Sequence, residues 1–276
     1  MSEDILVAEN IEVAFGGGRR VFGGARAAVK VLRGVSVRIG RGETVGVVGE
    51  SGSGKTTLGR ALLRLIDVSA GRIVFNGAEI TELSEAAMRP LRRRMQLIFQ
   101  DPMASLNPRH TIRRIVNEPM LFHRVANEMA DAESRARKIF ERFGLPLACL
   151  DRYPHELSGG QRQRVGIARA ALLAPDFVLA DEIVSGLDVS TQAQVLNLLK
   201  GLSRDLGLSM AFISHDLSVI RAVCDRVYVL NAGKVVEEGA CEAVFAAPRH
   251  EYTRALIDAI PLPRVDPDWL GRTETA

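Results

Sequence analysis

One glycine-rich segment constrains the fold of this chain more than any other, because it matches the phosphate-loop pattern G-x-x-x-x-G-K-[ST] in full. The segment reads Gly49-Glu50-Ser51-Gly52-Ser53-Gly54-Lys55-Thr56. Glycines let the backbone curl so that successive N–H groups point at phosphate oxygens, while the lysine adds a positive charge and the threonine hydroxyl can hold Mg²⁺. The sequence therefore predicts a site for the phosphates of a nucleotide.

The residues on either side of the loop have the character that such a site requires. Residues 44–48 predict a strand that ends at the loop, and residues 57–65 predict a helix that follows it. The N-terminus of this helix would add its dipole to the anion site. This order of strand, loop and helix predicts an α/β domain with a P-loop NTPase core.

Length and composition restrict the class of protein further. The chain has 276 residues, of which 47% are hydrophobic and 25% charged, as expected for a soluble globular α/β domain. No run approaches 18 apolar residues, and residues 1–10 lack the pattern of an export signal, so we expect neither a membrane span nor a leader. Acidic residues are interspersed among the arginine clusters and the net charge is only +3, which favours a docking surface over nucleic-acid binding.

The cysteines give no sign of a metal or redox centre. Cys149, Cys224 and Cys241 have no C-x-x-C spacing and no nearby histidine. We therefore expect buried thiols in a reducing cytosol.

The order of predicted elements divides the chain into four parts. Residues 1–100 predict an antiparallel β subdomain and the P-loop core, residues 101–160 an inserted helical subdomain, residues 161–245 the remainder of the core, and residues 246–276 a C-terminal extension. The turn at residues 40–42 favours a hairpin-like entry into the loop. Alternating strands and helices in the second half predict a mainly parallel sheet with ligands at the carboxyl ends of its strands. The extension predicts an exposed helical hook and then a loose end.

Two further patterns suit phosphoryl transfer. The apolar strand at residues 177–180 ends at Asp181 and Glu182, where one carboxylate can orient Mg²⁺ and its neighbour can polarise a water. Ser158 is a predicted N-cap, followed by Gly159 and Gly160, which allow close backbone approach at the start of a second helix. Two anion-binding helix ends would suit opposite faces of one ATP in a dimer.

In chain order, these motifs resemble the ATP-binding subunits of ATP-binding-cassette (ABC) transporters. The set also includes Gln100 after a strand, Asp188, and His215 within Ile213-Ser214-His215-Asp216, and the family's distinguishing motif is Leu157-Ser158-Gly159-Gly160-Gln161. The resemblance covers about residues 5–240. It implies an ATPase that uses ATP and Mg²⁺ at the cytoplasmic face of the inner membrane. It also implies a second ATP-binding subunit, identical or related, a separate membrane permease, and no nucleic acid.

The resemblance assigns the groups that touch the phosphates and the metal. Lys55 and the backbone N–H groups from Gly52 to Thr57 would hold the phosphates, while Thr56, Asp181 and Gln100 would support Mg²⁺. Glu182 would act as catalytic base, and Gln100 and His215 would hold the attacking water and the γ-phosphate.

The resemblance assigns the remaining positions to ATP binding across a dimer. Ser158, Gly159, Gly160 and Gln161 would bind the γ-phosphate of ATP held mainly by the opposite subunit, and Asp188 is assigned to the same nucleotide site. Phe15 would stack on the adenine, with Phe22 as the rival.

Three segments narrow the resemblance to the ATPases of oligopeptide, dipeptide and nickel importers: residues 100–109, Tyr153-Pro154-His155-Glu156, and residues 249–256 before Ile260-Pro261. A solute-binding protein would then be an indirect partner. The extension has no cysteine, so we expect no iron–sulfur cluster there. Two departures from the group's pattern, Ile183 for proline and Gly186 for alanine, predict a looser loop facing the opposite subunit.

Two alternatives from other classes remain. A soluble ABC-type ATPase acting on ribosomes or nucleic acid would carry tandem cassettes or a long coiled-coil insertion, and this chain has neither. A small-molecule kinase would use the phosphate loop but would not need residues 157–161.

Overall fold

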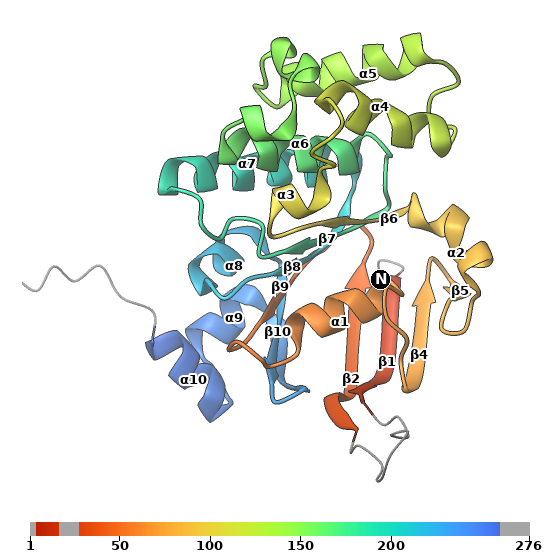
Figure 1. Cartoon of the computed structure of the whole chain (residues 1–276). Helices are drawn as coiled ribbons and strands as arrows, with labels where there is room; N and C mark the ends of the chain where they lie inside the picture. Colours follow the sequence, from red (N-terminus) through yellow and green to blue (C-terminus); the bar gives the residue numbers. More distant parts are fainter. Residues whose placement is uncertain (1–3, 17–27, 260–276) are drawn as a thin grey trace, which may run out of the picture.

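The computed structural model describes residues 4–16 and 28–259, which form two β-sheets and a set of helices (Figure 1). The larger sheet has six strands in the order β10-β9-β3-β8-β7-β6, and the smaller has four in the order β2-β1-β4-β5. The larger sheet consists of β3 (Thr44–Val48), β6 (Met95–Ile98), β7 (Phe177–Asp181), β8 (Ser209–Ile213), β9 (Arg226–Asn231) and β10 (Lys234–Ala240). The smaller consists of β1 (Asp4–Phe15), β2 (Val29–Gly40), β4 (Ala70–Phe75) and β5 (Ala78–Glu79).

The helices fall into groups that Figure 1 separates clearly. The upper, helical region contains α3 (Pro102–Ser105), α4 (Ile112–Phe122), α5 (Met129–Arg142), α6 (Gly159–Ala171) and the short 3₁₀ turns η1 (Leu147–Asp151) and η2 (Pro154–Glu156). The others are α1 (Lys55–Leu62), α2 (Glu85–Arg92), α7 (Val189–Leu206), α8 (Leu217–Val223), α9 (Cys241–Ala246) and α10 (Glu251–Asp258).

The strand pairings confirm the predicted mainly parallel sheet. β3 lies between β8 and β9 and is parallel to both, as β7 is to β6 and β8. In this larger sheet, only β10 runs antiparallel to its neighbour, β9. The carboxyl ends of β3, β7 and β8 therefore meet at one edge, where the phosphate loop, Asp181 and Ser214 follow them.

The predicted hairpin before the phosphate loop is wrong. β2 and β3 belong to different sheets, because the chain crosses from one to the other at residues 41–43. Burial explains the crossing: all five residues of β3 are buried, as suits a central parallel strand, whereas β2 alternates buried and exposed residues over much of its length. The backbone N–H of Glu43 donates to the carbonyl of Gly40 at 3.2 Å, which closes the turn.

Two apolar clusters make the core. One lies under α1 and between the two sheets, and includes Phe75 and Tyr228. The other joins the helical region to the larger sheet, and includes Phe140 and Phe212. The predicted apolar face of α5 is present, since Phe140 and Phe143 are buried and Ile139 packs against the same apolar cluster.

The C-terminal helix packs more closely than the exposed hook that the sequence predicted. In α10, Thr253 is buried, and Tyr252, Leu256 and Ile257 pack against the core. The helix is present as predicted and one face of it is exposed, but its apolar residues occupy the other face, which lies against Val48 of β3 and Val229 of β9. The expected loose end, residues 260–276, lies outside the described residues.

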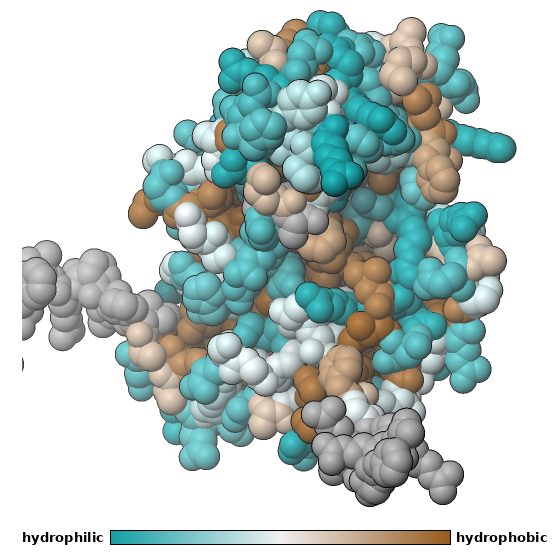
Figure 2. Space-filling model, viewed as in Figure 1, coloured by the Kyte–Doolittle hydropathy of each residue, from teal (hydrophilic) through white to brown (hydrophobic). Residues whose placement is uncertain are grey.

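The surface and the cysteines complete the description. Figure 2 shows hydrophilic side chains over most of the helical region and apolar side chains gathered in the middle of the same face. No helix among residues 4–16 and 28–259 is long and apolar enough to cross a membrane. All three cysteines are free and buried, as expected.

Candidate functional site

The phosphate loop occupies the gap between the end of β3 and the start of α1. Gly49 has φ 149°, and a Cβ there would lie 2.1 Å from the carbonyl oxygen of Leu230. Gly54 has φ 107° and is the N-cap of α1. Only glycine fits such a close approach at the first position and adopts the second conformation without strain. The two glycines therefore allow the tight curve that brings the loop over the helix N-terminus.

The loop presents unpaired hydrogen-bond donors. Within the described part of the chain, no acceptor meets the backbone N–H groups of five loop and helix residues: Gly52, Gly54, Lys55, Thr56 and Thr57. The buried hydroxyl of Ser53 also has no hydrogen-bond partner there. Unpaired N–H groups at a helix N-terminus form a ready anion site. The donors of this loop thus fit the phosphates of a nucleotide.

Lys55 supplies a positive charge inside the loop. Its side chain is almost fully buried, and Nζ donates to the carbonyl oxygens of Gly49 and Glu50, both at 2.8 Å. Burial lowers the pKa of the ammonium, and the nearby carboxylates of Glu182 and Asp181 oppose that shift. A bound phosphate would add a negatively charged acceptor for this poorly solvated cation.

Thr56 and Asp181 lie together beside the loop. The Thr56 hydroxyl donates to Oδ1 of Asp181 at 3.4 Å. Burial raises the pKa of Asp181, and the charge of Glu182 raises it further. A hydroxyl and a carboxylate are oxygen ligands of the kind that Mg²⁺ prefers, together with phosphate oxygens and water. These two side chains fit the metal role that the sequence predicts.

Glu182 lies at the centre of a polar cluster built from three strand ends. Its Oε2 accepts from Nε2 of Gln100 at 3.1 Å, and its Oε1 is 3.6 Å from Nδ1 of His215. The backbone of Glu182 is left-handed, with φ 49°, a conformation that is uncommon for residues other than glycine. Its N–H donates to the carbonyl of Ile213 at 2.9 Å, which holds this turn against β8. The structure thus brings together the three residues predicted to handle the attacking water.

The Leu157–Gln161 motif lies elsewhere. Ser158 caps α6: its Oγ accepts from the N–H of Gln161 at 3.2 Å, and Oε1 of Gln161 accepts from the N–H of Ser158 at 3.0 Å. Figure 1 places α6 in the helical region, away from α1. In the described residues, no hydrogen bond or ion pair of residues 158–161 reaches the phosphate loop. This half of the predicted site is therefore not brought to the phosphate loop of its own chain.

The residues around Asp188 support the start of α6. Asp188 caps α7, accepting from the N–H and hydroxyl of Thr191 at 2.9 and 2.7 Å and from the hydroxyl of Ser190 at 2.6 Å. These hydrogen bonds lower the pKa of Asp188 well below its usual range. A Cβ on Gly160 would lie 2.7 Å from Cγ2 of Thr191, so the two helices meet closely at this glycine. A contact of Asp188 with nucleotide stays a prediction.

Sequence reasoning also left parts of the surroundings undecided. Phe15 is half-exposed at the end of β1, and Phe22 lies outside the described residues, so the adenine partner stays a prediction. Ile183 is buried, and Gly186 has φ 77°, which favours glycine over alanine. Greater looseness of this loop stays a prediction.

Two contacts of the site were missed by sequence reasoning. The hydroxyl of Ser185 lies 3.3 Å from Nε2 of Gln100, and the hydroxyl of Tyr252 accepts from the N–H of Glu50 at 2.9 Å. Neither belongs to a recognisable local pattern. Tyr252 is about 200 residues from the loop, as the numbering shows, and only the tertiary fold joins them.

Comparisons with known proteins identify the family of the chain. The family profile described as "ABC transporter" matches residues 32–185. A putative peptide import ATP-binding protein of Brucella ovis is 56% identical over 248 residues, covering 90% of this chain and 77% of the relative. The oligopeptide transport ATP-binding protein AmiF of Streptococcus pneumoniae is 47% identical over 264 residues, covering 95% of this chain and 83% of AmiF.

Solved structures show the same fold. The ATP-binding cassette MJ0796, solved as a dimer in a post-hydrolysis state bound to ADP and Pi, superposes with a TM-score of 0.76 at 28% identity. It covers 86% of this chain, and 98% of MJ0796 is matched. The structure of cbiO1 from Clostridium perfringens, part of the transporter complex cbiONQ, gives a TM-score of 0.75 at 27% identity and covers 94% of this chain and 97% of cbiO1. The chain belongs to the ABC transporter family, as an ATP-binding ATPase subunit.

Proposed function

We propose that this ATPase energises the import of peptides through a separate membrane permease, at the cytoplasmic face of the inner membrane. Relatives named for peptide or oligopeptide transport cover almost the whole chain, which is the observation that carries the proposal. The polar cluster of Gln100, Glu182 and His215 beside the loop supports hydrolysis as the energy source. Nickel or another solute remains the second candidate, delivered in either case by a solute-binding protein.

Each residue of the cluster has a distinct task in the proposed hydrolysis. ATP and Mg²⁺, when bound, supply the phosphoryl group and the charge neutralisation. Lys55 and the loop N–H groups would hold the phosphates, and Thr56 and Asp181 would hold the metal. Glu182 takes a proton from the attacking water, while Gln100 and His215 fix the position of its carboxylate. Keeping these groups close before ATP binds reduces the reorganisation that hydrolysis requires.

A second copy or a related chain completes the site in this proposal. The Ser158 end of α6 is exposed and has no link to the loop of its own chain. A helix N-terminus with two glycines suits a phosphate from another subunit. The cassette MJ0796 was solved as a dimer, which supports the participation of a second subunit. ATP would then lie between the loop of one subunit and residues 158–161 of the other.

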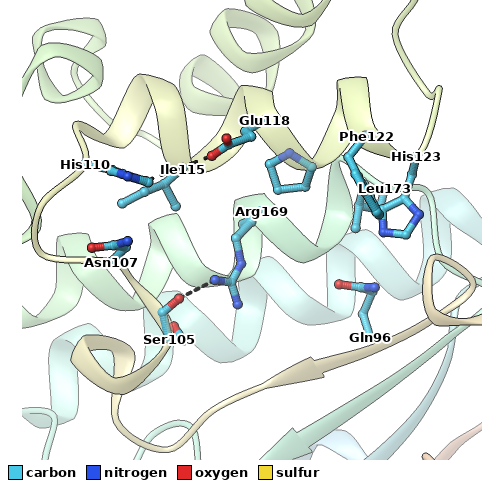
Figure 3. Close-up of a pocket in the computed structure, with 11 residues that line it drawn as sticks. Gln96, Ser105, Asn107, His110, Ile115, Glu118, Phe122, His123, Arg169 and Leu173 are labelled. Atoms are coloured by element: carbon cyan, nitrogen blue, oxygen red, sulfur yellow. Dashed lines mark hydrogen bonds and ion pairs between the residues drawn. The ribbon is translucent and has the colours of Figure 1, made fainter. Parts of the chain in front are cut away.

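A groove beside α4 is the proposed docking site for the permease (Figure 3). It has a volume of about 580 Å³ and an apolar wall that includes Ile115, Phe122 and Leu173. Arg169 points into it and donates to the carbonyl of Ser105, but pairs with no carboxylate of the described residues. A partner helix with an apolar face would suit this groove. Either an acidic side chain on that helix or the carbonyl groups at its C-terminus would pair with Arg169.

Reconstitution tests the proposed function. The chain would be co-expressed with the permease and solute-binding protein of a peptide importer from the same organism, and ATP hydrolysis and uptake would be measured in vesicles with peptide or Ni²⁺. We expect peptide to stimulate both, and Phe122→Ala to weaken permease binding without lowering ATP affinity. If Ni²⁺ stimulated uptake and hydrolysis and peptide did not, nickel would be the transported solute instead of peptide. ATPase activity that never responds to the permease would refute the transport role.

A further inference from the structure

We infer that Tyr252 is a positioning residue for the phosphate loop, through which the C-terminal helix α10 sets ATP affinity. The inference deepens the proposed function and rests on ATP binding at this loop. It starts from one hydrogen bond: the N–H of Glu50 donates to the Tyr252 hydroxyl at 2.9 Å. Glu50 was not among the residues predicted to contact phosphate.

The hydrogen bond holds one end of a peptide unit whose other end is held by Lys55. The peptide between Gly49 and Glu50 carries the Gly49 carbonyl, which accepts from Nζ of Lys55 at 2.8 Å, and the Glu50 N–H, which donates to Tyr252. A cation at the carbonyl and an acceptor at the N–H polarise the same peptide in the same direction. Tyr252 and Lys55 therefore favour one orientation of this peptide.

This peptide controls the first bend of the loop. Gly49 packs so tightly against the carbonyl of Leu230 that a Cβ would not fit. Rotation of the peptide would turn the Gly49 carbonyl away from Lys55. When Lys55 directs its hydrogens to phosphate, its hold on the carbonyl weakens, and Tyr252 still keeps the peptide in place. The hydroxyl thus stabilises the loop conformation that binds phosphate.

The position of Tyr252 is fixed by contacts on both sides of it. Glu237, in β10, accepts from the N–H of Arg249 at 2.8 Å and from the N–H of His250 at 3.0 Å. His250 caps α10 through its Nδ1, which accepts from the N–H of Tyr252 at 3.1 Å. Farther along the helix, Leu256 and Ile257 line a narrow apolar gap with Val48, the last residue before the loop.

The anchoring contacts make the hydroxyl a fixed acceptor. Burial raises the pKa of Tyr252, so the hydroxyl stays protonated at neutral pH. The loop is therefore braced by an element that follows the rest of the core in sequence. Any change that moves α10 would change the affinity of the site for ATP.

The test compares Tyr252→Phe with Tyr228→Phe in the full chain. Phenylalanine removes only the hydroxyl in each case. The Tyr228 hydroxyl accepts from the N–H of Arg38 at 3.0 Å and from Arg226 at 2.9 Å, away from the loop. The measurements are thermal unfolding, equilibrium titration with ATP, kcat and KM for hydrolysis, and hydrogen exchange at the Glu50 amide.

We expect Tyr252→Phe to raise the Kd and KM for ATP about 2- to 10-fold, the range for one net hydrogen bond, with kcat at saturating ATP changed less than about twofold. Exchange at the Glu50 amide becomes faster in the absence of ATP. Tyr228→Phe lowers the unfolding temperature and leaves Kd and Glu50 exchange unchanged.

The inference is overturned if Tyr252→Phe keeps the wild-type Kd, or if both variants weaken ATP binding equally, which would mark a general loss of stability. It is also overturned if exchange at Glu50 does not change. A wild-type chain that fails to bind ATP would refute the proposed function instead, and Glu50 exchange in the two variants would still test the hold of Tyr252 on the loop.

Discussion

Replacing Glu182 with glutamine is predicted to stop hydrolysis while preserving ATP binding. Glutamine has the same shape, and its oxygen can still accept from Nε2 of Gln100, which lies 3.1 Å from Glu182 Oε2. The side chain is 21% exposed, and a replacement of the same shape keeps its packing, so we expect the fold and the phosphate loop to stay intact. The amide, however, cannot take a proton from water. Loss of a general base lowers kcat about 10²- to 10⁴-fold, which corresponds to about 2.7–5.5 kcal/mol in the barrier.

The assay measures phosphate release at saturating Mg²⁺ and ATP, together with an equilibrium titration of ATP without turnover. Glu141→Gln is the matched control, because Glu141 is an exposed carboxylate on α5, in the helical region. We expect the control to match the wild type in both measurements. If Glu182→Gln retained more than about a tenth of the wild-type kcat, well above the range for loss of a base, the assignment of Glu182 would be refuted.

The remaining predictions concern the metal site, the core and the docking groove. Burial raises the pKa of Asp181, so ionising this side chain destabilises the folded protein: the destabilisation is zero below the unfolded pKa and develops as the pH rises through the folded pKa. Asp181→Asn should therefore raise the unfolding temperature at pH 7.5 and abolish Mg²⁺-dependent hydrolysis. An unchanged or lower unfolding temperature would contradict this. Phe140→Ala should cost about 3–5 kcal/mol of unfolding free energy in urea titrations, since the ring is fully buried, whereas Phe122→Ala, at an exposed ring, should cost far less; equal losses would contradict the packing. Arg169→Met should weaken permease binding in a pull-down while leaving ATP affinity unchanged, and unaltered binding would remove Arg169 from the docking surface.

Sequence reasoning reached the parts of the molecule that are encoded locally. The phosphate loop needs a strand, a glycine-rich turn and a helix in direct succession, and all three appear within residues 44–62. The carboxylates Asp181 and Glu182 follow an apolar strand for the same reason. Because the carboxyl ends of parallel strands share one edge, a mainly parallel sheet already implies that these groups meet.

Features that depend on distant packing were not predictable in this way. The turn at residues 40–42 has the composition of a hairpin, yet β2 and β3 pair with other strands, because burial of all five β3 residues requires neighbours on both sides. Similarly, α10 is short and partly polar, and only the apolar residues of β3, β9, α8 and α9 that line the gap beside it explain why it packs. The contact of Tyr252 with Glu50 follows from that packing and leaves no local trace.

The central claim is that each ATP site is shared between two subunits, and complementation tests it most directly. Lys55→Ala disables the phosphate loop, and Ser158→Arg blocks the exposed start of α6. Each variant alone should hydrolyse no ATP, because every site of its dimer carries one of the two defects. If each site combines the loop of one subunit with residues 158–161 of the other, one site of a mixed dimer carries both defects and the other site carries none. We predict that mixing the two variants restores part of the hydrolysis, at the one intact site of each mixed dimer. A mixture that hydrolyses ATP no faster than either variant alone would contradict the shared site.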